Sequence, residues 1–98
     1  MITLTGEVRK VEKADYTNKK TGEITPQSIL IMEPLRGRSN YEIYLNEKQI
    51  SGGAVAHWEK LKGKQASIPV HLFVNYDYKF HKFNAYGDGL PLNNKQGV

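Results

Sequence analysis

Cysteine is absent from the 98-residue sequence, which excludes disulfide bonds and thiolate metal ligands and gives no sign of an oxidising compartment. No apolar run approaches the roughly 20 residues of a membrane-spanning helix, and no basic segment followed by an apolar one opens the chain, so we expect neither a membrane helix nor a leader peptide.

Residues in catalytic arrangements are also scarce. His57, His71 and His81 lie far apart in the sequence and lack the close spacing of a helical metal-binding pair. No serine lies in a nucleophile elbow, and no glycine-rich loop carries the lysine and hydroxyl residue that phosphate transfer requires. We therefore predict a protein that is not an enzyme, with no metal and no cofactor.

The composition indicates one small β domain. The length suits a single modest core, and the chain has 9 glycines, 10% aromatic residues and only short apolar runs. Its net charge of +4 is compatible with a polyanionic partner, although many basic proteins bind none.

The clearest pattern begins at Gly63 and continues to Leu92. Apolar residues at every second position predict a strand with one face on a core: Ala66, Ile68, Val70, Leu72 and Val74. Polar residues occupy the opposite face: Gln65, Ser67, His71 and Asn75. Phe73 interrupts this division, because it lies on the face that should contact water.

Aromatic and cationic residues are interleaved in the rest of this segment. The aromatic residues are Tyr76, Tyr78, Phe80, Phe83 and Tyr86, and the cationic or titratable ones are Lys79, His81 and Lys82. A ring beside a cation can stack a nucleobase and neutralise its phosphate. Any single ring could equally belong to the core, but alternation directs some of them outward. We expect the hairpin from Phe73 to Tyr86 to project beyond the body of the fold, either closing over a ligand or docking on a second subunit, with the second alternative favoured.

The first strand is expected to be long and bent. Ile2, Leu4 and Val8 share a face, and the next apolar residue, Val11, is out of phase with them. This one-residue slip predicts a β-bulge near residues 9–10. Gly6 permits either a bend or the close approach of another backbone.

Two basic loops flank the second strand, which we predict over residues 24–33, with Pro26 at an edge, a bulge or the strand's start. The loop of residues 16–23 is either a solvated hairpin or a basic finger that closes over a bound strand, with Lys19 and Lys20 at its tip and Tyr16 at its base. The loop of residues 34–40 carries Arg36 and Arg38, whose planar guanidinium groups suit phosphate.

A third strand over residues 41–45 places Tyr41 and Tyr44 on opposite faces. The segment that follows is helical. Asn46 and Gln49 fit a capping box, and Ile50, Ala54, Trp58 and Leu61 recur with helical spacing. The glycines at 52–53 are expected to separate a short turn from a helix of about ten residues. Trp58 is expected to plug a barrel rather than to serve as a ligand platform.

These elements predict an all-β fold with one short helix, a five-stranded OB-fold Greek-key barrel whose helix lies between the third and fourth strands. The chain resembles the small OB-fold single-stranded-DNA-binding proteins of phages and plasmids, in architecture and spacing rather than in a diagnostic motif. Four segments carry the resemblance: residues 2–8, 19–23, 63–70 and 86–91. It is similar in outline to the filamentous-phage helix-destabilising proteins, which coat replicating genomes as cooperative dimers. The resemblance implies a domain over residues 1–92, a short tail over 93–98, a homodimer, and a place in the cytoplasm of a bacterial host.

The sequence leaves two candidate functions of different classes open. The first is sequence-tolerant binding of single-stranded DNA or RNA, and the second is an OB-fold protein-interaction module such as a replication accessory. The co-occurrence of rings and cations favours the first. The residues expected to contact nucleic acid are Tyr16, Lys19, Lys20, Arg36, Arg38, Tyr41, Tyr44, Phe73, Tyr76, Tyr78, Lys79, Phe80, His81 and Lys82.

Overall fold

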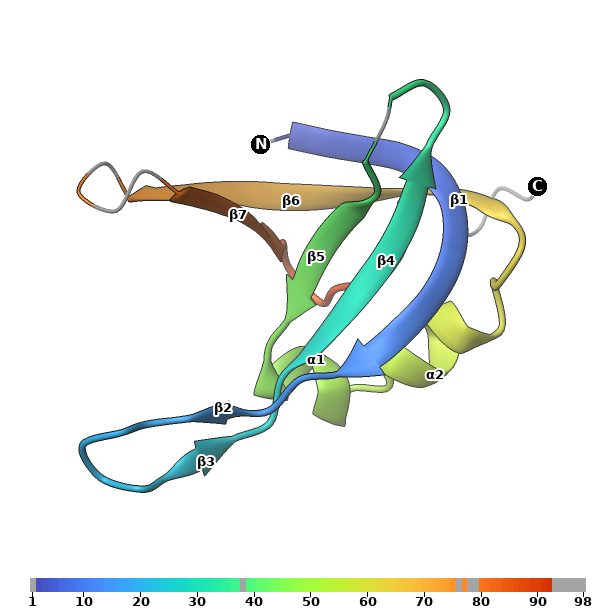
Figure 1. The fold of residues 1–98 in the computed structure, drawn as a ribbon. Coiled ribbons are helices and arrows are strands. Elements are labelled where there is room, and N and C mark those ends of the chain that lie inside the picture. The colour runs from blue at the N-terminus through green and yellow to red at the C-terminus, as the bar shows by residue number, and fades with distance from the viewer. Residues whose placement is uncertain (1, 38, 76, 78–79, 93–98) are drawn as a thin grey trace.

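A computed structural model of the chain describes residues 2–37, 39–75, 77 and 80–92, with the side chains at 75 and 80 left out. Within these residues, seven strands and two helices follow one another in the order β1 (Ile2–Lys13), β2 (Tyr16–Thr17), β3 (Ile24–Thr25), β4 (Ser28–Pro34), β5 (Tyr41–Leu45), α1 (Glu47–Ser51), α2 (Ala54–Glu59), β6 (Gln65–Asn75) and β7 (Phe80–Ala85). Figure 1 shows that β1, β4, β5, β6 and β7 surround the core while β2 and β3 form a separate extension.

The five long strands close a barrel in the order β1-β4-β5-β7-β6, and β6 pairs back to β1. Every pair in the barrel is antiparallel except β5 with β7, which is parallel. The helices connect β5 to β6, the third and fourth barrel strands. This order and connection are those of an OB-fold, as the sequence predicts. The structure corrects the predicted helix of about ten residues: the turn before Gly52 is itself helical, so the connection holds two short helices of five and six residues.

The long first strand is shared between two sheet neighbours. Its first half pairs with β6 and its second half with β4, and the register shifts between Val8 and Lys10. The predicted bulge is therefore confirmed. Gly6 lies at the bend, where a Cβ atom would overlap the carbonyl oxygen of Glu33. The close approach of two backbones thus excludes a side chain at this position.

The core fills the barrel and continues under the helices. Trp58 is its largest fully buried side chain, and its Nε1 atom donates a hydrogen bond of 2.7 Å to the carbonyl oxygen of Gly89. The indole therefore has both apolar neighbours and a partner for its polar atom, which confirms the barrel plug. The other buried apolar residues of this cluster are Leu4, Val8, Leu30, Met32, Ile43, Leu45, Ala54, Ile68, Val70 and Ala85.

The predicted capping box is present at the start of α1. The amide of Gln49 donates to the side chain of Asn46 at 2.9 Å, and the amide of Asn46 donates to the side chain of Gln49 at 2.8 Å. The Nε2 atom of Gln49 also donates to the carbonyl oxygens of Ala85 and Gly87. One buried side chain therefore ties the helix start to the end of β7.

Two ribbons extend from the barrel on the same side (Figure 1). We name the first, residues 16–25, the finger, and it contains β2 and β3. The predicted second strand is thus divided, since Pro26 lies between β3 and β4 and cannot donate a ladder hydrogen bond. We name the second ribbon, which consists of residues 71–75 of β6 and 80–82 of β7, the wing.

The wing corrects one part of the predicted core. Leu72 and Val74 continue the alternation of β6, but they are 38% and 39% exposed instead of buried. The reason is that the described part of β1 pairs with β6 only as far as Val70, so among the described residues β6 pairs from Leu72 onward with β7 alone. Two strands without a further layer cannot bury either face.

Candidate nucleic-acid interface

A groove opens where β5 and β7 separate. These parallel strands are paired at Ile43 with Phe83 and at Tyr44 with Asn84, and their N-terminal ends then diverge toward the β4–β5 loop and the wing. The groove has a volume of about 380 Å³. It is lined by Ser39, Asn40, Tyr41, Glu42, Tyr44, His81, Lys82 and Phe83. Four of these eight residues belong to the site expected from the sequence.

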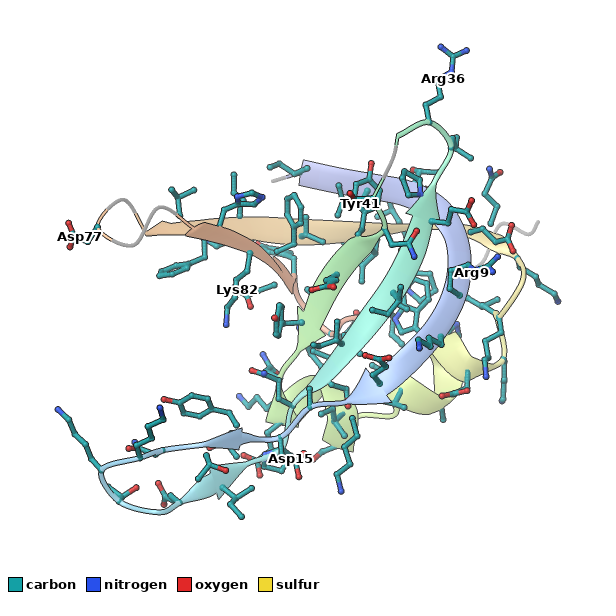
Figure 2. All side chains as sticks on the ribbon, in the orientation of Figure 1. Arg9, Asp15, Arg36, Tyr41, Asp77 and Lys82 are labelled. Carbon is teal, nitrogen blue, oxygen red and sulfur yellow. The ribbon has the colours of Figure 1, made fainter. Side chains whose placement is uncertain are left out.

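Lys82 lies over one aromatic ring of the groove and opposite a second aromatic residue in the wing. The Nζ atom of Lys82 lies 4.6 Å from the centroid of the Tyr44 ring, within cation–π range. Phe73 lies directly opposite Lys82 in the β6–β7 ladder, so both side chains project from the same face of the wing. Figure 2 shows Lys82 pointing toward the side on which the finger lies. We name Tyr44, Phe73 and Lys82 the platform.

His81, on the other face of the wing, belongs to a cluster of edge-to-face rings with Phe83 and Tyr41. The ring centroids of Tyr41 and Phe83 are 6.3 Å apart at 81°, and those of His81 and Phe83 are 6.1 Å apart at 75°. Tyr41 and Phe83 are half-buried and pack against the core. These two rings therefore contribute to barrel stability as well as to the wall of the groove.

The finger presents exposed groups beside this arrangement. Lys19, Lys20 and Tyr16 are all exposed, and Tyr16 is 56% exposed. The turn is ordered locally, because the side chain of Asn18 accepts a hydrogen bond of 2.9 Å from the amide of Lys20 and its carbonyl accepts one of 2.7 Å from Gly22. The two lysines are therefore held at the tip of a short ribbon and not on a long irregular loop.

The remaining expected residues are not gathered at the groove. Arg36 points away from the barrel at the far end of the β4–β5 loop, as Figure 2 shows. Arg38, Tyr76, Tyr78 and Lys79 lie outside the described residues, as does the side chain at position 80.

The groove also contains residues that the sequence did not single out as contacts. Phe83 was recognised as one ring among several, and its spacing of two from His81 was the available signal that both share a face. Glu42 and Tyr44 are likewise two residues apart on β5 and share a face of that strand. Ser39 and Asn40 carried no comparable signal, because both precede the strand.

Metal-binding groups and membrane-spanning helices were both considered for their residue requirements in the part of the chain that the structure describes. That part contains no group of three or more His, Cys, Asp or Glu residues that could hold a metal ion. None of its helices is long and apolar enough to cross a membrane.

The fold and the groove together define a small OB-fold-like barrel with an aromatic and basic surface. Comparison of the chain with protein-family models, with curated proteins and with solved structures finds no match in any of the three.

Proposed function

We propose that this protein binds single-stranded nucleic acid with little sequence preference, and that its ligand is single-stranded DNA in phage or plasmid replication within the cytoplasm of a bacterial host. The observation that carries the proposal is the platform, in which Lys82 lies over Tyr44 and opposite Phe73. Rings supply stacking surfaces for any base, and an adjacent ammonium group supplies a partner for the phosphate.

The contact between Lys82 and Tyr44 suggests how a base enters. A base that stacks on the covered face of the Tyr44 ring must displace the ammonium group of Lys82. The cation–π contact that is lost is worth about 0.5–1 kcal/mol at an exposed site. Stacking of a base is worth about 1–3 kcal/mol. The exchange is therefore favourable, and it releases the ammonium group to a phosphate oxygen of the same strand.

The finger supplies the second boundary of the binding surface. It extends on the same side of the barrel as the wing, and its exposed tip carries Lys19 and Lys20 (Figure 1). A strand on the platform brings its phosphates near these charges, and Tyr16 at the finger's base offers one further ring. Stacking on these rings requires unpaired bases, so the arrangement favours single strands over duplexes.

A separate observation, on the face of the wing that also carries His81, supports the proposal of a homodimer. Leu72, Val74 and the neighbouring Ile2 expose large apolar side chains there. Exposed apolar side chains of this kind can pack against their own copy about a two-fold axis, so we propose a second copy of this chain as the partner. The alternative function, an OB-fold module for a different protein partner, would use the same face.

Titration of fluorescent oligonucleotides tests the proposed function. Equal lengths of single-stranded DNA, single-stranded RNA and duplex DNA are titrated at several salt concentrations and followed by anisotropy. We expect single-stranded DNA to bind more tightly than the duplex, with an affinity that falls as salt rises. Equal binding of duplex and single strand, or no binding above background, would reject the proposal and leave the protein-interaction module.

A further inference from the structure

Glu42 is an unpaired carboxylate in a groove that otherwise suits a polyanion. Its side chain lines the groove together with Lys82, is exposed, and forms no ion pair among the described residues. Five other carboxylates do have a cationic partner: Glu7, Glu12, Asp15, Glu33 and Glu59. Glu42 shares this lack of an ion pair with Glu47, but of the two only Glu42 lies in the groove.

The position of Glu42 on β5, relative to the platform, decides which part of a nucleotide its carboxylate can meet. Glu42 and Tyr44 are two residues apart on β5, so they project from the same face at a spacing of about 7 Å. The carboxylate therefore lies beside the Tyr44 ring and not on it, where it can meet the edge of a base stacked there.

The chemistry of a carboxylate limits what it can accept from a nucleic acid. An ionised carboxylate is an acceptor only, and it repels phosphate. The favourable contacts available to it are the N–H donors on base edges, such as the N4 amino group of cytosine. Thymine and uracil present a carbonyl oxygen at the corresponding position, which a carboxylate repels.

We propose that Glu42 selects amino-bearing bases, cytosine over thymine in particular, at the nucleotide that stacks on Tyr44. This inference rests on the proposed function and adds a moderate base preference to it. Lys82 binds the phosphate, and Glu42 accepts a hydrogen bond from the edge of the base. One groove therefore holds separate contacts for the two parts of a nucleotide.

The test compares homopolymers of deoxycytidine and deoxythymidine of equal length. Wild type, Glu42→Gln and the matched control Glu47→Gln are titrated with each, since Glu47 is an exposed carboxylate without an ion pair among the described residues and lies on α1, outside the groove. Glutamine has the size of glutamate, but its amide can also donate to the thymine carbonyl. We expect Glu42→Gln to lower the ratio of deoxycytidine to deoxythymidine affinity by roughly two- to tenfold, and Glu47→Gln to leave it unchanged.

The possible outcomes separate this inference from the proposed function. If Glu42→Gln strengthens binding of both homopolymers equally, Glu42 acts only by repelling phosphate and the base preference is refuted. An unchanged ratio with unchanged affinities refutes it as well, while leaving single-strand binding intact. Failure of wild type to bind either homopolymer rejects the proposed function itself. Circular dichroism of each variant confirms that the exposed substitution leaves the fold unaltered.

Discussion

The ammonium nitrogen of Lys82 lies 4.6 Å from the centre of the Tyr44 ring, although the two residues are 38 positions apart in the sequence. The contact exists because β5 and β7 pair in parallel next to the groove, where Tyr44 lies beside Asn84. Phe73 joins them from β6 through the antiparallel ladder. Three strands therefore build one surface that none of them carries alone.

Truncation of the platform rings should weaken binding without unfolding the protein. We expect Tyr44→Ala or Phe73→Ala to cost about 1–3 kcal/mol in single-strand binding, because each removes a ring that can stack on a base. Tyr44→Phe is the matched control and should bind nearly as wild type. Titration of fluorescent oligonucleotides measures the effect, and urea unfolding of the same variants checks the fold. Full affinity of Tyr44→Ala would remove this ring from the site.

Phosphate contacts can be counted from the salt dependence. Each lysine that neutralises a phosphate of a single strand contributes about 0.7 to the slope of log affinity against log salt. Lys82→Gln and Lys20→Gln should each reduce the slope by about this amount. Lys60→Gln should leave it unchanged, because Lys60 is exposed at the end of α2, outside the groove. A slope that is equally reduced in all three variants would indicate a diffuse effect of net charge instead of specific contacts.

Local features of the fold could be predicted because each rests on neighbours in the sequence. The phase slip after Val8 indicated the bulge, and Gly6 indicated the close backbone approach. Asn46 and Gln49 indicated the helix start, three residues apart. The order of elements then pointed to the OB-fold, because few small barrels have a helix between the third and fourth strands.

The groove could not be predicted in the same way. Alternation assigns Leu72 and Val74 to one face of β6, but it cannot tell whether another layer covers that face. No neighbour in the sequence marks Glu42, because only the parallel pairing of β5 and β7 brings it into one groove with Lys82. Arg36 was expected to contact nucleic acid, and the β4–β5 loop places it away from this groove.

Trp58 should be a stability residue and not a binding residue. It is fully buried, and its indole donates to the carbonyl oxygen of Gly89. Trp58→Ala removes the largest buried side chain and leaves that carbonyl without this donor, so we expect a loss of about 3–5 kcal/mol in the free energy of unfolding. Urea denaturation measures it. The assignment is wrong if Trp58→Ala unfolds like wild type but loses binding, while Phe73→Ala unfolds the domain.

Gly6 should tolerate no side chain. A Cβ atom there overlaps the carbonyl oxygen of Glu33, and both atoms belong to backbone that cannot move independently. We expect Gly6→Ala to destabilise the barrel by about 1–3 kcal/mol. Gly52→Ala is the control, since its added Cβ meets its nearest atom at 3.4 Å and its φ of −80° suits alanine. Equal unfolding midpoints for the two variants would contradict the close approach of β1 and β4.

Substitutions on the two faces of the wing should distinguish the proposed dimer from the platform. Val74 lies on the face that also exposes Leu72, whereas Phe73 lies on the platform face. Val74→Lys places a charge on this apolar face, so it should convert a dimer into a monomer. Phe73→Ala should leave the mass unchanged while weakening binding, which makes it the control within the same strand. Light scattering without nucleic acid measures the mass. A wild-type protein that is monomeric at high concentration would refute the dimer and leave both faces of the wing to the ligand.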